Sequence, residues 1–267
     1  LNVDISMDRG AALQRAGKRA EQLDLGPGRV ERAASFSHDG TVQTFVELEA
    51  GGKDAFRRMI RKDHYQPFQW HVRLYEPGQP REATVRFTPD GRVYGFKETW
   101  PESDSGPALP SEEALSIAET RATNHWNVDL GSYELISRGQ QEVSSGRVDH
   151  TFTYEHKSRS IGEGDYRLRL GVSGNQLSEV TYYVRVPEAF KRRYANMRSA
   201  NSLIQTSGNV IVYGLYLLVG CLFGAYWLVR KDALRWRMPL AWGGLITALM
   251  ILSRLNALPL AWMNYDT

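Results

Sequence analysis

The sequence contains one cysteine, so no disulfide can form within the chain and cysteine usage says nothing about its compartment. An excess of charge is also missing from most of the chain. Of the 33 basic and 30 acidic residues, residues 210–267 hold five and two, so residues 1–209 hold 28 of each. A nucleic-acid-binding domain concentrates basic side chains on one soluble face, so nucleic acid is not an expected partner.

Motifs for catalysis and for cofactor binding are lacking as well. No phosphate-binding loop, nucleophile elbow or zinc signature occurs. The only paired carboxylates, Glu112 and Glu113, begin a predicted helix, where acidic side chains favour the helix dipole. The histidines are scattered, without the spacing of metal ligands. They are His38, His64, His71, His125, His150 and His156. We therefore predict no catalytic, cofactor-binding or metal-binding residue.

A long uncharged run covers residues 210–229. A helix of that length spans about 30 Å, the thickness of the hydrocarbon core of a bilayer. Tyr213 and Trp227 lie near its two ends, where aromatic rings favour the headgroup level. The alternative is a buried helix of a soluble protein, but such helices are usually shorter and seldom uncharged on every face. The run predicts a transmembrane helix.

A second apolar run, residues 238–263, is interrupted by Arg254 and predicts a second transmembrane helix within residues 210–267. The short segment 230–237 between the two runs is basic, and the positive-inside rule places it in the cytoplasm and residues 1–209 outside. We therefore expect a multi-pass protein of the cell membrane with the lipid bilayer as a partner. Gly220 and Gly224 form a Gly-x-x-x-Gly pattern, which predicts close packing of another helix.

The part before the membrane predicts an α+β fold with antiparallel sheets. Its first half reads as a helix capped by Asp8, a strand pair, a short helix and three further strands. The strand pair is residues 30–37 and 41–49, the second predicted from the alternation of Val42, Thr44, Val46 and Leu48. A linker over residues 101–110 precedes a second helix, which we expect Ser111 to cap. Four strands follow, over residues 133–137, 149–156, 166–172 and 177–186.

The two halves resemble each other, because each begins with an amphipathic helix and ends with a turn, a strand and Pro-Glu. This pattern predicts two tandem units, residues 1–103 and 104–187, related by internal duplication. Two unrelated α+β units with similar turns are the alternative. Residues 188–209 form a basic amphipathic segment, which predicts a juxtamembrane linker helix. That helix either lies along the lipid headgroups or serves as a stalk packed on the preceding sheet.

Several sequence blocks resemble one bacterial family. They are FVELE at 45–49, YQPFQW at 65–70, FTPDGRVYGF at 87–96, GRVDHTF at 146–152, RVPEAF at 185–190 and RSAN at 198–201. These blocks resemble the extracytoplasmic region of CPBP-family intramembrane proteases, relatives of the CAAX prenyl proteases. The repeated helix-plus-sheet units are also similar to PepSY-type modules, which occur beside proteases and in membrane receptors.

The resemblance implies that the catalytic residues lie elsewhere. The family uses a Glu-Glu-x-x-x-Arg motif and histidines on later membrane helices, with a divalent metal such as zinc possible there. Glu112 and Glu113 do not match this motif, because Ile117 occupies the arginine position, and no histidine follows His156. We therefore expect the chain, which begins at Leu1, to be the non-catalytic N-terminal part of a longer protease whose remaining membrane helices contact it.

The soluble part is expected to recognise protein or peptide substrates, or to gate their access. Sheet edges can accept an extended peptide, and aromatic side chains can contact it. The candidate aromatic residues are Trp70, Tyr75, Tyr94, Phe96, Tyr182 and Tyr183. The alternative for these residues is that they are ordinary core and cross-strand pairs. The alternative function is an extracytoplasmic sensor or receptor module of a membrane signalling protein.

Overall fold

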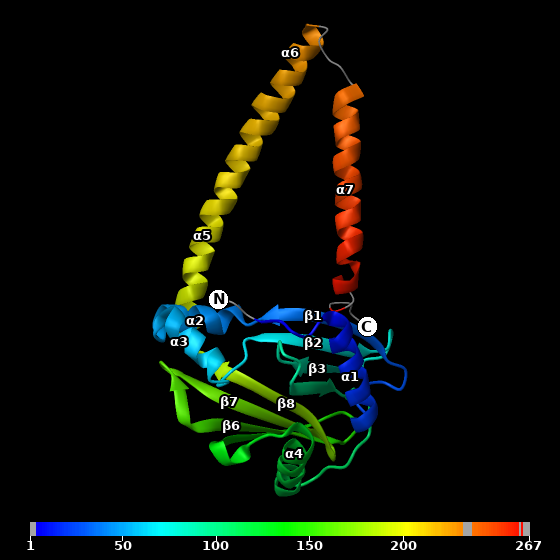
Figure 1. Cartoon of the computed structure of the whole chain (residues 1–267), viewed down its shortest axis with the longest axis vertical. Helices are drawn as coiled ribbons and strands as arrows, with labels where there is room; N and C mark the ends of the chain where they lie inside the picture. Colours follow the sequence, from blue (N-terminus) through cyan, green and yellow to red (C-terminus); the bar gives the residue numbers. More distant parts are fainter. Residues whose placement is uncertain (1–3, 232–236, 262, 264–267) are drawn as a thin grey trace. The chain divides into compact units, whose positions relative to one another are not determined.

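The computed structural model describes residues 4–231, 237–261 and 263. The chain divides into two compact units, one of residues 1–187 with 259–267 and one of residues 188–258. The first contains an antiparallel sheet with helices and the second is helical, so the fold is mixed α+β with two long apolar helices near the C-terminus (Figure 1). The predicted fold class is confirmed.

One sheet of eight antiparallel strands organises residues 1–187. The strand order is β1-β2-β3-β4-β8-β7-β6-β5, so the last strand of each half lies at the centre and the first at an edge. The strands are β1 Glu31–His38, β2 Phe68–Tyr75, β3 Glu82–Phe87, β4 Val93–Thr99, β5 Tyr133–Glu142, β6 Val148–Ile161, β7 Gly164–Ser173 and β8 Gln176–Arg185.

Period-two patterning fixes which face of the sheet is buried. In β7 the side chains of Tyr166, Leu168, Leu170 and Val172 are buried, while the arginines between them are half-buried. This is the arrangement that the alternation predicts, because successive side chains of a strand point to opposite faces. One face of the sheet therefore holds the apolar core, and the other carries polar side chains.

Helices α1 (Arg9–Leu23) and α4 (Ser111–Trp126) cover the apolar face, α1 against β1 and β2 and α4 against β6, β7 and β8 (Figure 1). Both present alanines to the sheet at a spacing of about one turn, which allows close approach of helix and strand. The buried alanines are Ala12, Ala16 and Ala20 in α1, and Ala114, Ala118 and Ala122 in α4. Both helices contribute to one continuous core.

The helix starts differ in how they are capped. Asp8 caps α1 as predicted, with its carboxylate accepting a hydrogen bond of 2.7 Å from the backbone N–H of Ala11. The expected cap by Ser111 is wrong, because Pro110 precedes the first turn of α4 and no side chain caps it. Ser111 instead lies inside the first turn with Glu112 and Glu113, whose charges favour that end of the helix.

The predicted strand over residues 41–49 is wrong, because α2 (Gly40–Glu49) occupies this segment. Asp39 caps it by accepting a hydrogen bond of 3.0 Å from the N–H of Val42. The buried side chains are Val42, Phe45 and Val46, whose spacing of three and four residues places them on one face of a helix. Leu48, which the alternation places inside, is 61% exposed. The next helix, α3 (Gly52–Arg61), corresponds to the predicted short helix, with ends that differ by one or two residues.

The helical unit contains two apolar helices. The first runs without a break through α5 (Glu188–Leu215), the π-helical segment η2 (Tyr216–Phe223) and α6 (Gly224–Arg230). The predicted linker helix over residues 188–209 is thus continuous with the apolar run. The second is α7 (Arg237–Ala261). Both are long and apolar enough to span a membrane, and their apolar stretches are not buried inside the protein. Residues 232–236 of the predicted basic loop lie outside the described residues.

Gly220 and Gly224 both lie on the first of these helices, Gly220 in the π-helical segment and Gly224 at the start of α6. Within the described part of the chain, a Cβ atom on Gly224 would have no neighbour within 4 Å beyond the backbone of its own helix, so the face is open at that point. Packing of another helix against this pair stays a prediction. The division of residues 1–187 at residue 103 also stays a prediction, although each half contributes one helix on the apolar face and four consecutive strands to the sheet.

Candidate functional site

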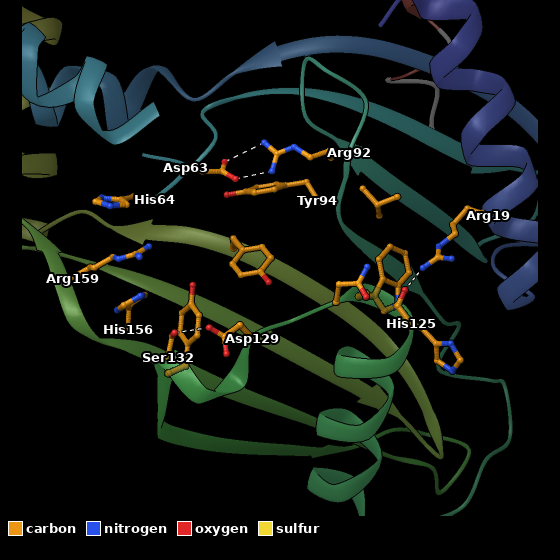
Figure 2. A pocket seen from close by; sticks show the side chains of 15 residues that line it. Arg19, Asp63, His64, Arg92, Tyr94, His125, Asp129, Ser132, His156 and Arg159 are labelled. Atoms are coloured by element: carbon orange, nitrogen blue, oxygen red, sulfur yellow. Dashed lines mark hydrogen bonds and ion pairs between the residues drawn. The ribbon is translucent and has the colours of Figure 1, made fainter. Parts of the chain in front are cut away.

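A cleft of about 640 Å³ opens within residues 1–187. Side chains reach it from α1, from the segment after α3, from the end of α4 and from strands β4, β5, β6 and β8 (Figure 2). The cleft thus collects residues from both halves of the sheet. Its volume lies in the range of about 300–1,000 Å³ that is typical of small-molecule sites.

The end of α3 places two of the lining residues. Asp63 adopts a left-handed backbone conformation, with φ of 53°. The N–H of Asp63 donates to the carbonyl of Ile60 at 3.0 Å, and the N–H of His64 donates to the carbonyl of Met59 at 3.1 Å. This pair of bonds is a Schellman motif, which ends the helix and turns the chain sharply. The turn directs Asp63 and His64 into the cleft.

An irregularity in the pairing of β6 positions two further lining residues, His156 and Arg159. The register from Glu155 to Ser160 advances five residues along β6 but only two along β7, so four residues of β6, 156–159, have no partner there. His156 still pairs with Tyr133 across β5, and their ring centroids lie 5.1 Å apart. Arg159 lies within the irregular stretch. Bulges of this kind redirect side chains, and here both His156 and Arg159 line the cleft.

The carboxylate of Asp63 is fully engaged. Its Oδ2 lies 2.6 Å from Nη1 of Arg92, and its Oδ1 accepts hydrogen bonds from Nη2 of Arg92 at 3.3 Å and from the side-chain amide of Gln66 at 2.5 Å. The hydrogen bond from Arg92 holds the pKa of Asp63 below its ordinary value. Arg92 is occupied as well, because its Nε donates to Asp90 at 3.0 Å.

The second acidic side chain of the cleft, Asp129, accepts a hydrogen bond from a residue three positions further along the chain. The hydroxyl of Ser132 donates to its Oδ2 at 2.6 Å, and this bond lowers the pKa of Asp129. Ser132 lies in the short 3₁₀ helix η1 (Leu130–Ser132) that precedes β5. The Ser132 hydroxyl donates to a carboxylate rather than to the imidazole of His156. Ser132 and His156 therefore do not form a pair of nucleophile and general base.

Arg19 is the third arginine to line the cleft. One of its Nη atoms donates to the backbone carbonyl of His125, and its guanidinium lies 5.1 Å from the centre of the Trp126 ring. Trp126 in turn stacks on Phe96, with ring centroids 4.1 Å apart. Arg19 therefore joins α1 to the end of α4, and its charge is directed at an aromatic face and a carbonyl.

Four cationic or potentially cationic side chains of the lining remain. His125 is exposed at the end of α4, and Arg159, His64 and His156 form a separate group. Among the described residues, the Arg159 guanidinium forms no hydrogen bond or ion pair. In the view of Figure 2 it lies between the rings of His64 and His156. Burial of the two rings lowers the pKa of each histidine, and the positive charge of Arg159 lowers both further. The free cleft therefore favours neutral imidazoles beside one permanent positive charge.

An aromatic wall lies next to these residues. Tyr182 has ring neighbours on both sides, Tyr94 at 5.2 Å and Tyr133 at 6.4 Å between centroids. Burial raises the pKa of Tyr182 and raises that of Tyr133 to about 12, so both remain neutral phenols. The hydroxyl of Tyr94 accepts a hydrogen bond of 3.1 Å from the N–H of Gln66. The cleft combines apolar ring surface with a few polar groups.

The sequence anticipated this site only in part. Of the six candidate aromatic residues, Tyr94 and Tyr182 line the cleft, whereas Trp70, Tyr75 and Phe96 are buried in the fold. Tyr183 lies under the guanidinium of Arg169, 5.2 Å from its ring centre. The contributions of His64, His156 and Arg159 were missed, because His64 is about ninety residues from the other two and the three form no motif. The described residues contain no cluster of three or more histidine, cysteine or acidic side chains suited to a metal ion.

The comparisons with known proteins give no assignment: no family model, no curated protein and no solved structure matches the chain. The fold and the cleft therefore define only a class, an α+β protein with a side-chain-lined cleft and two apolar helices of membrane-spanning length.

Proposed function

We propose that this chain is a membrane-anchored, non-catalytic recognition module that binds protein or peptide in its cleft. The cleft carries the proposal, since it joins an aromatic wall to unpaired donors in a volume that suits a ligand. Within the described residues, no nucleophile contacts a base there, and no metal-binding cluster adjoins it. These are properties of a binding site rather than of a hydrolytic centre.

We further propose that both apolar helices cross the membrane and that residues 1–209 are extracytoplasmic. The exposed apolar side chains of the helices support the spanning, because a soluble protein would bury such surface. The basic segment 230–237 supports the orientation. Protease treatment of intact cells tests the sidedness. Cleavage within residues 1–209 is expected from outside, and cleavage there only after the cells are opened would contradict the proposed topology.

The larger protein is proposed to be a CPBP-type intramembrane protease, on the basis of the sequence blocks that resemble that family. The rival proposal is a sensor or receptor, which the pair of histidines beside Arg159 favours because their charge depends on pH. The sequence that follows Thr267 in the gene distinguishes the two. Further apolar spans with Glu-Glu-x-x-x-Arg and histidine favour the protease, and a cytoplasmic signalling domain favours the receptor.

Recognition can be tested on the full chain in lipid nanodiscs. Random hexapeptides with a photo-crosslinking group at the N-terminus are added, and the crosslinks are mapped by mass spectrometry. Crosslinks near Tyr133 and Tyr182 are expected, and the peptides should remain intact with or without added zinc. Crosslinks confined to surfaces outside the cleft would contradict the recognition site, and turnover of the peptides would contradict the non-catalytic role.

A further inference from the structure

We infer that the cleft binds a free carboxylate group, held by Arg159 together with the imidazoles of His64 and His156. The inference rests on the proposed function of the cleft as a recognition site, and it names the chemical group that is recognised. The charge distribution is the first argument for it. Asp63 is paired with Arg92, and Asp129 accepts from Ser132. The guanidinium of Arg159 is thus left without a counter-ion among the described residues.

The available donors are the second argument. Nδ1 of His156 accepts a hydrogen bond of 3.3 Å from the backbone N–H of Ser158, which assigns the proton of the neutral ring to Nε2. That N–H is then free to donate to a ligand. The ring nitrogens of His64 form no hydrogen bond within the described part of the chain, so His64 can donate as well. Arg159 adds the planar fork that matches a carboxylate with two parallel bonds.

The surroundings favour a carboxylate over a phosphate. A doubly charged phosphate is usually held by the N-terminus of a helix or a nest of backbone N–H groups. Helices α3 and α4 meet this cleft with their C-terminal ends, at Asp63 and Trp126, where the helix dipole is negative. One arginine and two neutral imidazoles match a single negative charge better. The tyrosine wall beside them suits an organic body attached to that charge.

Two sources can supply such a group: the C-terminus of a peptide or a small organic acid. The test uses the full chain in nanodiscs and a library of hexapeptides randomised at the last three positions. The library is offered once as free acids and once as C-terminal amides. The small-acid probe is 3-phenylpropionate, and inorganic phosphate is the anion control. Binding is measured for the unmodified chain, for Arg159→Gln and for Arg29→Gln, which removes an exposed arginine outside the cleft.

The expected result is that the free-acid library binds at least about tenfold more tightly than the amides, since only the carboxylate accepts two charge-assisted hydrogen bonds from Arg159. Arg159→Gln should remove most of this preference, and Arg29→Gln should leave it unchanged. If 3-phenylpropionate alone binds and depends on Arg159, the carboxylate site stands with a small acid as its ligand, and peptide recognition fails.

Equal binding of acids and amides overturns the carboxylate inference but leaves the recognition function intact. Phosphate binding as tight as that of either carboxylate probe also overturns it. A chain that binds none of the probes overturns both the inference and the proposed function. Thermal unfolding of Arg159→Gln is measured alongside, and it is expected to match the unmodified chain because Arg159 is exposed and has no partner within the described residues.

Discussion

The backbone of Gly95 lies against the carbonyl oxygen of Val180, so closely that a Cβ atom on Gly95 would fall 2.3 Å from that oxygen. Gly95 also has φ of 157°, a conformation that L-residues rarely adopt. The contact lies where β4 pairs with β8, and only Phe96 with Val180 and Lys97 with Glu179 are in register there. The junction between the two halves of the sheet therefore depends on a glycine.

Replacing Gly95 by alanine is expected to destabilise this junction by about 3 kcal/mol or more, because the added methyl group overlaps a backbone atom that cannot move alone. Gly78→Ala is the matched control, since Gly78 also has a positive φ but has open space around it. That change should cost about 1 kcal/mol. Urea unfolding of the full chain in mild detergent measures both. Equal losses would show that the close approach at Val180 is unimportant.

Arg147 is expected to be one of the costliest polar residues to remove. Its side chain is 1% exposed, forms a two-bond pair with Asp149 at 2.8 and 3.0 Å, and donates to the carbonyls of Pro101 and Asp104. Arg147→Leu leaves these acceptors unpaired and should cost about 3–5 kcal/mol in the free energy of unfolding.

Arg138→Leu is the comparison for that change, because Arg138 forms an exposed ion pair with Glu112. Its loss should cost less than about 1 kcal/mol. A small effect at both positions would mean that the linker over residues 101–110 is held by something other than Arg147.

His71 makes the sheet sensitive to acid. Burial, with a smaller contribution from the charge of Arg86, lowers the pKa of His71 from 6.5 to about 4. The folded state therefore resists protonation that the unfolded state accepts. The contribution of neutral His71 to the free energy of unfolding is therefore fully present above pH 6.5. It is lost as the pH falls from 6.5 toward 4, by about 3 kcal/mol at most. In His71→Gln this part of the acid loss should disappear, whereas His38→Gln, at an exposed site, should retain it.

The affinity of the cleft for a carboxylate should increase as the pH falls. His64 faces the charges of Arg159, Lys62 and Asp63 and the ring of His156; His156 faces Arg159 and Asp129. A bound carboxylate favours the charged imidazoles and raises their pKa, so binding takes up protons and tightens from about pH 8 to about pH 5.5.

Calorimetric titration of 3-phenylpropionate over that pH range measures the effect. The double change His64→Gln and His156→Gln should leave an affinity that varies little with pH, and Arg159→Gln should weaken binding throughout. An unmodified chain whose affinity is the same at every pH would exclude the two imidazoles as ligand contacts.

Cys221 offers a direct test of membrane insertion, because it is the only cysteine of the sequence and lies near the middle of the uncharged run 210–229. In sealed membranes it should resist a membrane-impermeant maleimide and react fully once detergent is added. Ser144→Cys in a Cys221→Ala background should react without detergent when added from outside, since Ser144 is exposed in the sheet unit. Rapid labelling of Cys221 in sealed vesicles would exclude the transmembrane assignment.

The sequence predicts well those features that depend on neighbours in the chain. The alternation of β7 and the cap at Asp8 both follow from local patterns. The segment from Gly40 to Glu49 was predicted wrongly because it carries both patterns. Val42, Thr44, Val46 and Leu48 alternate as in a strand, whereas Val42, Phe45 and Val46 have helical spacing, and Asp39 caps the helix that forms. The pairing of β4 with β8 joins segments about eighty residues apart, and local patterns carry no signal for such a contact.

The cleft lay beyond sequence reasoning for the same reason. Arg159 lies in a stretch of four β6 residues, 156–159, that are unpaired with β7, and no sequence motif predicts that irregularity. His64 arrives through the left-handed turn at Asp63, a residue that tolerates this conformation but does not require it. Scattered histidines were therefore interpreted as unrelated, although two of them flank one arginine in space.

The order of the strands also constrains how the protein is made. The partner of β4 is the last strand of the sheet to be synthesised, and α5 begins three residues after it ends. While the ribosome works through the second half, the first half presents β4 as an open edge, which is a surface for pairing with other chains. That edge is covered only after β8 has been made, and β8 ends 25 residues before the uncharged run begins at residue 210, so the sheet is completed shortly before the first apolar segment is synthesised.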